Sequence, residues 1–188
     1  MGVGALRAVF LDRDGVLNRA IVRDGKPYPP AGLHELEILP DVPAALAILK
    51  DCGFLLLVVT NQPDVARGLQ QRATVESMHA ALAQALPLDD FFVCYHDDPD
   101  GCDCRKPKPG LLAQAAAKYG LDLGASYLIG DRWRDIEAGQ AAGCEAVWID
   151  RGYAERAPAE ASAARVSSCL EAARWIAAQV HGNKVGGG

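Results

Sequence analysis

The sequence has no apolar stretch of the ~18 residues that a membrane-spanning helix needs. The first residues, MGVGALRAVFLDRDG, carry charges at Arg7 and Asp12, and no run before them is long enough for a secretory signal. Basic charge is also in short supply, since the formal net charge is -5 and the isoelectric point is about 5.3. Neither nucleic acid nor an anionic membrane is therefore expected as a partner. We expect a cytosolic protein.

The body of the chain also lacks internal repeats and low-complexity tracts. Half of its 188 residues are hydrophobic, which is enough for a full core in one domain. We expect that domain to span residues 1–181 and to be monomeric. The Gly-rich tail GNKVGGG, residues 182–188, is predicted to be disordered.

Disulfides are not expected from the six cysteines, because they are rare in a reducing compartment. Cys52, Cys144 and Cys169 are scattered in apolar or helical contexts, which is typical of buried thiols. The other three cysteines lie together in the stretch CYHDDPDGCDCRKPKPG, beside a histidine and several basic residues.

Short apolar runs alternate with helical patterns along most of the chain. Strands are predicted at 8–11, 54–60, 91–96, 126–130 and 145–150, and helices at 41–52, 73–86, 109–119 and 135–142, with Asp41 as the cap of the first helix. This alternation predicts an α/β fold with a Rossmann-like, doubly wound parallel sheet. Residues 18–39, with DGKPYPP, fall outside the pattern and are predicted to form a flap of loops and turns.

Carboxylates follow two of the predicted strands. Asp12 and Asp14 come after the first strand, and Asp131 and Asp135 follow the fourth at the start of a helix. D-x-D-G also occurs in turns and calcium loops, and acids at a helix start often only offset its dipole. However, ligands collect at the carboxyl ends of parallel strands, and carboxylates gathered there would repel one another without a cation. A Mg²⁺ site explains the set.

Two further groups fall at the same edge of the predicted sheet. Thr60 and Asn61 end the second strand and offer hydrogen-bond donors to phosphate oxygens, and Lys106 can bring a positive charge. Taken singly, Thr-Asn is ordinary turn chemistry and most lysines lie on solvated surface.

A second metal site is predicted in the cysteine-rich loop. Cys94, His96, Cys102 and Cys104 supply three thiolates and an imidazole, a complete tetrahedral set for Zn²⁺. A redox pair or chance clustering are the alternatives, but C-x-C is not the C-x-x-C of redox proteins. A closed site is structural, and it would stabilise a loop that has few apolar residues. Arg105 and Lys106 directly follow the last ligand, so a bound zinc would hold these two basic side chains close to the phosphate site.

The motifs DxD with GVLN, VVTN, K-P and GDxxxD, in this order, resemble the haloacid dehalogenase superfamily of phosphohydrolases. The resemblance covers residues 8–150 and implies a phosphoaspartyl mechanism. It implies that Asp12 is the nucleophile and Asp14 the acid and base. Asp12, the Asp14 carbonyl and Asp131 would hold Mg²⁺, and Asp135 would support that site. Thr60 and Asn61 would bind phosphoryl oxygens, and Lys106 would offset transition-state charge.

Within subfamily IIIA of this superfamily, the loop with the four predicted zinc ligands (the zinc loop) and Ala66-Arg67-Gly68 are similar to the same segments of the D-glycero-D-manno-heptose 1,7-bisphosphate 7-phosphatases. This similarity implies that Arg67, Arg105 and Arg132 contact the sugar or its distal phosphate, in a site without a large cap domain. The chain departs from that pattern at Pro63-Asp64, in place of Ser-Gly, and in the flap, to which no residue role transfers.

Two alternatives remain from the sequence. The zinc loop and Gly130-Asp131-Arg132 also resemble the histidinol phosphatases, which would share the same metal site but have a different pocket beside the flap. The other alternative is a binding module that a zinc ion stabilises and that has no enzymatic activity. The joint presence of Asp12, Asp14, Lys106 and Asp131 argues against it.

Overall fold

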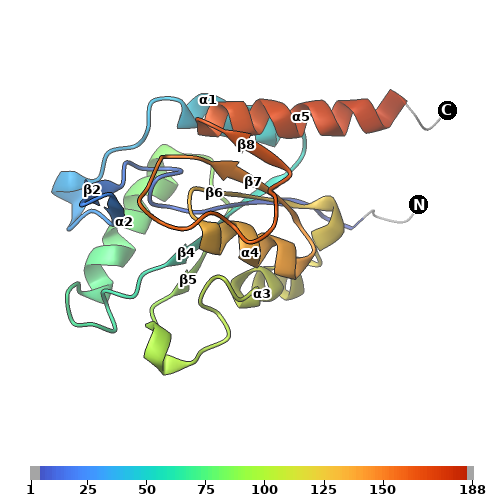
Figure 1. Ribbon diagram of the computed structural model, residues 1–188. Coiled ribbons are helices and arrows are strands. Elements are labelled where there is room, and N and C mark those ends of the chain that lie inside the picture. Colours follow the sequence, from blue (N-terminus) through green and yellow to red (C-terminus); the bar gives the residue numbers. More distant parts are fainter. Residues whose placement is uncertain (1–4, 186–188) are drawn as a thin grey trace.

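A six-stranded parallel sheet forms the centre of the computed structural model, which describes residues 5–185 (Figure 1). The strand order is β5-β4-β1-β6-β7-β8, and every neighbouring pair is parallel. The strands are β1 (Ala8–Leu11), β4 (Leu55–Asn61), β5 (Asp90–Cys94), β6 (Tyr127–Gly130), β7 (Glu145–Ile149) and β8 (Ala164–Val166). The predicted fold class is confirmed.

Helices cover both faces of the sheet because its central strands are apolar on both sides. The helices are α1 (Val42–Asp51), α2 (Arg72–Ala85), α3 (Gly110–Tyr119), α4 (Trp133–Ala142) and α5 (Cys169–Val185). In β1, Val9 and Leu11 pack in the same core as α1 and α5, whereas Ala8 and Phe10 pack with α3 and α4. Figure 1 shows α1 and α5 on one side of the sheet and α3 and α4 on the other.

The nine predicted strands and helices are all present, with ends that differ by no more than two residues. Strand β8 and helix α5 were not predicted from the sequence. Helix α5 contributes Ala173 and Ile176 to the core and packs along α1 (Figure 1). Because α5 continues to Val185, residues 182–185 are helical instead of belonging to a tail. Residues 186–188 of the predicted tail lie outside the described residues.

Asp41 has a different partner from the one predicted. Its side chain makes no capping hydrogen bond to α1; instead it accepts one from the backbone N–H of Leu170, at 3.0 Å, in the first turn of α5. Asp41 therefore ties the start of the unpredicted helix to the start of α1.

The predicted flap contains a small antiparallel hairpin, β2 (Ile21–Arg23) and β3 (Lys26–Tyr28), followed by the 3₁₀ turn η1 (Leu33–Glu35). Asp24 and Gly25 form its tip with φ of 50° and 73°, the conformation of a tight Asp-Gly hairpin turn. The tip docks on the segment after β7, where Ala154 N–H donates to Gly25 O at 2.8 Å. A Cβ on Gly25 would lie 2.7 Å from the Ala154 Cβ, so this contact requires glycine.

Among residues 5–185, no helix combines the length and apolar character needed to cross a bilayer.

Candidate active site

Three buried aspartates meet at the carboxyl edge of the sheet. Asp12 follows β1, Asp131 follows the adjacent strand β6, and Asp135 lies in the first turn of α4. One carboxylate oxygen from each lies within 4.8 Å of the other two, and the residues are 7%, 2% and 2% exposed. The structure thus brings together three of the predicted magnesium residues.

The electrostatics of this cluster favour a bound cation. Burial raises the pKa of Asp131, and the neighbouring Asp12 and Asp135 carboxylates raise it further. Burial likewise raises the pKa of Asp12 to about 7, against the opposing effect of Lys106. Among the described residues, Asp131 Oδ1 is buried without a hydrogen-bond partner. A carboxylate oxygen that has no hydrogen-bond partner, in a cluster of acidic residues, is a suitable ligand for a hard divalent cation such as Mg²⁺.

Lys106 forms ion pairs with two of these aspartates. Its Nζ lies 2.7 Å from Asp12 Oδ1 and 2.6 Å from Asp135 Oδ1, and it also donates to Val59 O at 2.8 Å. Burial alone would lower the pKa of Lys106, but the two carboxylates raise it above its usual value. The lysine is therefore held charged beside Asp12, although it is only 2% exposed.

Asn61 holds Lys106 in place through the backbone. Its Nδ2 donates to Lys106 O at 3.0 Å, and its Oδ1 accepts from Lys106 N–H at 3.1 Å. The amide, which we expected to bind phosphoryl oxygens, is therefore engaged with the loop. Thr60 precedes Asn61 in the same strand, and its Oγ1 accepts a hydrogen bond from Gln62 Nε2 at 2.9 Å.

Asp14 lies beside this cluster and accepts hydrogen bonds from three side chains. Arg13 donates to both of its oxygens, Asn18 to Oδ1 and Gln62 to Oδ2, at distances of 2.9–3.1 Å. Burial would raise the pKa of Asp14, but Arg13 and the other donors bring it below its usual value. Sequence reasoning did not identify Arg13 or Gln62 as site residues, since Arg13 occupies the variable position of the DxD motif and Gln62 follows the last residue of VVTN.

Gly15 allows the turn that brings these groups together. Its φ is +88°, and a Cβ there would lie 1.8 Å from Asp131 Oδ2. Arg151 donates to Gly15 O at 2.9 and 3.1 Å, so the turn is also fixed from the segment after β7. This geometry excludes any side chain at position 15.

Asp12, Asp14 and Asp135 line a cavity of about 230 Å³. Its lining includes the hairpin, through Lys26 and Tyr28, together with Thr60, Asn61 and the arginines expected to bind substrate, Arg67, Arg105 and Arg132. Lys26, Tyr28 and Arg134, which also lines the cavity, were not identified from the sequence, because the first two lie in the flap and Arg134 occupies a variable position of GDxxxD. The structure therefore places the flap and the zinc loop on the same pocket as the carboxylates.

The pocket arginines are all ion-paired. Arg67 pairs with Asp97 at 2.7 Å, and Arg105 with Asp98 at 2.7 Å. Arg132 pairs with Glu155, in the segment after β7. Lys26 is the one lining cation for which residues 5–185 provide no ion pair or hydrogen bond. It is thus free to meet an anionic group of a ligand.

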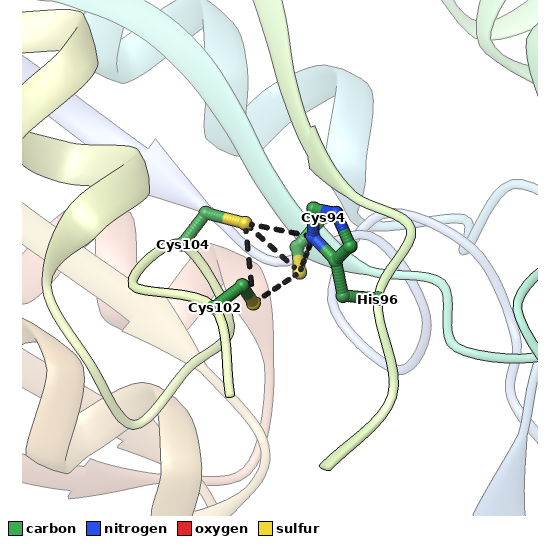
Figure 2. Close-up of side chains that lie close together, drawn as sticks. All are labelled: Cys94, His96, Cys102 and Cys104. Carbon is green, nitrogen blue, oxygen red and sulfur yellow. Dashed lines mark hydrogen bonds between the residues drawn. The ribbon is translucent and has the colours of Figure 1, made fainter. Parts of the chain in front are cut away.

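The four predicted zinc residues converge from two segments, the end of β5 and the loop before α3 (Figure 2). Cys104 Sγ lies 3.2 Å from Cys94 Sγ, 3.5 Å from Cys102 Sγ and 3.3 Å from His96 Nδ1. In a tetrahedral site with Zn–S bonds of about 2.3 Å, ligand atoms lie slightly less than ~4 Å apart. The geometry of the cluster therefore fits a zinc ion.

The acid-base state of the thiols is compatible with this use. Burial raises the pKa of Cys94 and of Cys104. Burial also acts to raise the pKa of Cys102, but hydrogen bonds from Cys104 and from the Arg105 backbone lower it to about 7. Metal binding requires thiolates, and a bound metal lowers thiol pKa values further.

The loop is packed directly against helix α3 and the pocket. A Cβ on Gly110, the first residue of α3, would lie 2.1 Å from Asp103 O. Asp97 begins the 3₁₀ turn η2 (Asp98–Asp100), where its side chain and that of Asp100 cap the turn reciprocally. Asp97 and Asp98 also pair with Arg67 and Arg105, so the acids of the loop fix the arginines at the pocket rim.

Comparisons with known proteins show which family this chain resembles. The HAD-hydrolase-like family matches residues 103–173. The D-glycero-beta-D-manno-heptose-1,7-bisphosphate 7-phosphatase of Pseudomonas aeruginosa is 39% identical over 153 residues, 79% of this chain and 83% of that protein. The Escherichia coli K12 enzyme of the same name is 37% identical over 148 residues, 72% and 74% of the two chains.

A solved structure extends the comparison to the fold. It is the D,D-heptose 1,7-bisphosphate phosphatase of B. bronchiseptica, complexed with magnesium and phosphate, which is 28% identical. Its TM-score is 0.76, and the superposition covers 93% of this chain and 99% of the other.

Proposed function

This chain belongs to the D-glycero-beta-D-manno-heptose-1,7-bisphosphate 7-phosphatases among the HAD-like phosphoric monoester hydrolases, and we propose that it removes the 7-phosphate of that sugar bisphosphate through a phosphoaspartyl intermediate on Asp12. The observation that carries the mechanism is the buried cluster of Asp12, Lys106, Asp131 and Asp135, of which Asp12, Lys106 and Asp135 line a pocket rimmed with cations.

We propose that Asp12, the backbone carbonyl of Asp14 and Asp131 hold a Mg²⁺ ion, with Asp135 in support. The unpartnered Asp131 Oδ1 and the mutual repulsion of the carboxylates support this assignment. When bound, Mg²⁺ would shield the nucleophile from the charge of the phosphate. Asp135 also orients Lys106 and accepts a hydrogen bond from Arg132 N–H at 3.0 Å.

In the first half-reaction, a carboxylate oxygen of Asp12 attacks phosphorus while Asp14 gives a proton to the departing sugar oxygen. The pKa of Asp14 is lowered in the structure without substrate, so this role requires that the negative charge of the bound phosphate raise it and let Asp14 take up a proton. Lys106, 2.7 Å from Asp12 Oδ1, offsets the negative charge that builds up around phosphorus. Thr60, near the end of β4, would offer its hydroxyl to a phosphoryl oxygen. Asn61 acts through Lys106, because its amide holds that backbone.

We propose that zinc held by Cys94, His96, Cys102 and Cys104 is structural. Four protein ligands leave no position for substrate, and the described loop has little apolar packing of its own. The ion would fix the segment from which Arg105 and Lys106 reach the pocket.

The distal phosphate of the substrate is assigned to the cations of the pocket rim, Lys26, Arg67, Arg105 and Arg132. The three arginines already have carboxylate partners, which orient them, and Lys26 adds an unshared charge from the hairpin. We also propose that the protein is a monomer and acts in the cytoplasm.

The direct test is phosphate release with Mg²⁺ from both anomers of the heptose 1,7-bisphosphate, alongside histidinol phosphate and common sugar phosphates. We expect the highest kcat/KM for one heptose anomer. A higher value for histidinol phosphate would overturn the substrate assignment while leaving the phosphatase chemistry. No metal-dependent release from any of these substrates would contradict the proposed mechanism as well.

A further inference from the structure

Arg13 stands between the two catalytic aspartates in the sequence, and its side chain is 0% exposed. Its Nε and Nη2 donate to Asp14 Oδ1 and Oδ2, at 3.1 and 3.0 Å. A guanidinium buried this completely must have all of its donors satisfied, or the cost of burying the charge is not recovered. This pair of hydrogen bonds, the Arg13 fork, satisfies the donors on the Nε and Nη2 side of the guanidinium.

The other side of Arg13 meets a histidine from helix α2. Arg13 Nη1 lies 3.1 Å from His79 Nε2, and since a guanidinium only donates, Nε2 is the acceptor. The His79 ring is stacked on Phe91 of β5, with ring centroids 4.8 Å apart and 24° between the planes. Burial, and then Arg13, lower the pKa of His79 to about 4, so the ring is neutral and able to accept at neutral pH.

Arg13 has a special place among the donors to Asp14. Asn18 and Gln62 each bond one carboxylate oxygen, whereas the Arg13 fork bonds both. Two parallel bonds from one planar group hold a carboxylate in the plane of that group, a restraint that bonds from two separate amides, Asn18 to Oδ1 and Gln62 to Oδ2, do not impose. The orientation of Asp14 therefore depends on Arg13, and that of Arg13 depends on His79.

We propose that Arg13, seated by His79, is a positioning residue that fixes the carboxylate of Asp14 for hydrolysis of the phosphoenzyme. This inference rests on the proposed function. In that step water attacks phosphorus, the bond between phosphorus and the Asp12 oxygen breaks, the proton of the water passes to Asp14, and inorganic phosphate leaves. A base must lie within hydrogen-bond reach of the water, so rotation of its carboxylate slows this step.

The test compares His79→Phe, which keeps the stacking and loses the acceptor, with His79→Gln, which keeps an acceptor. p-Nitrophenyl phosphate is the substrate, because its leaving group departs without a proton from Asp14. We expect His79→Phe to lower kcat about tenfold while kcat/KM stays within about twofold. A burst of about one p-nitrophenol per active site should appear, and phosphate should accumulate on Asp12. His79→Gln should behave as the unchanged protein.

A parallel fall of kcat and kcat/KM without a burst would overturn the inference, since that is the result of a merely structural role. Unchanged kinetics in His79→Phe would overturn it too. Arg13→Lys, which keeps the charge and loses the fork, should give the same burst and provides the test if His79→Phe does not fold. Absence of turnover in the unchanged protein would instead contradict the proposed function, and the inference with it.

Discussion

Asp131 is held by two side chains that come from elsewhere in the chain. Its Oδ2 accepts a hydrogen bond from the Tyr153 hydroxyl at 2.8 Å, and its backbone carbonyl accepts one from Trp148 Nε1 at 3.2 Å. Both partners come from β7 or the segment after it. A donor to one carboxylate oxygen orients the other, here the unpartnered Oδ1, toward a metal.

Tyr153→Phe removes that donor and little volume. We expect the Mg²⁺ concentration for half-maximal activity to rise about tenfold, because partners of metal ligands typically affect affinity by 10- to 100-fold. Activity at saturating Mg²⁺ should be close to that of the unchanged protein. A Mg²⁺ titration of phosphate release measures this, and an unchanged midpoint would contradict the role of Tyr153.

Asp12→Asn tests the nucleophile with almost no change of shape. An amide does not attack phosphorus, so we expect turnover to fall at least about a thousandfold. The fold should survive, since the variant removes a charge from a cluster of three buried carboxylates. Steady-state hydrolysis by a variant with an unchanged circular dichroism melting curve would remove Asp12 as the nucleophile.

At the scale of elements, the loop from Cys94 to Lys106 joins the candidate zinc residues to Lys106, the lysine proposed to act in catalysis. The loop has ion pairs at the pocket rim, and Cys94 is buried in the core shared with α3 and α4, but Cys102 and Cys104 pack only at the edge of that core. Side-chain packing alone is a weak restraint on such a segment, which is why the metal is expected to contribute to its order.

Cys102→Ser should lower both the zinc content and the temperature of unfolding. The expected zinc content falls from about one ion per chain to less than half of that, because a hydroxyl is a poor zinc ligand. Cys52→Ser, outside the cluster, is the matched control and should keep its zinc. Elemental analysis and thermal unfolding measure the two quantities. Full activity in a variant with no bound zinc would refute the structural role.

The β2–β3 hairpin lines part of the pocket. Its tip is fixed by the contact of Gly25 with Ala154, and it presents Lys26 to the cavity. Ala154 lies between Tyr153 and Glu155, the partners of Asp131 and Arg132. One segment after β7 therefore orients the metal site, a rim arginine and the hairpin together.

Lys26→Met should raise KM for the heptose bisphosphate about tenfold, the effect of losing one charge contact worth ~1.4 kcal/mol. Lys26→Arg, the control, should keep most of the affinity. A substrate with a single phosphate should be hydrolysed equally well by all three proteins. Equal losses for both substrates would show that Lys26 does not contact the distal phosphate.

At the scale of the whole molecule, His79 links catalysis to stability. Its pKa is lowered from 6.5 to about 4 in the folded protein, mainly by burial. Between pH 6.5 and 4 the unfolded chain therefore binds a proton that the folded chain does not. Stability must then fall as the pH is lowered through this window, by up to about 3 kcal/mol from this residue.

Urea unfolding of the unchanged protein and of His79→Phe, at pH 7 and at pH 4.5, tests this. We expect the free energy of unfolding to fall less on acidification in the variant than in the unchanged protein. Comparing the two proteins removes the contribution of the other titrating groups. Parallel losses in both would contradict the assignment.

The sequence alone determined the sheet strands that carry the site and both candidate metal clusters. Asp12 and Asp131 are recognisable because each directly follows an apolar strand, and parallel strands bring their carboxyl ends to one edge. Cys94, His96, Cys102 and Cys104 are recognisable because their spacing is local. Such patterns involve few residues, so they can be read without knowledge of the fold.

Only the tertiary structure decided which side chains support that chemistry. His79 reaches Arg13 across 66 residues of sequence, Asn61 reaches Lys106 across 45, and Arg151 reaches Gly15 across 136. The hairpin contact with Ala154 and the docking of α5 are likewise contacts between distant segments. No local pattern encodes these pairs, because they form only when the sheet brings the loops at its edge together.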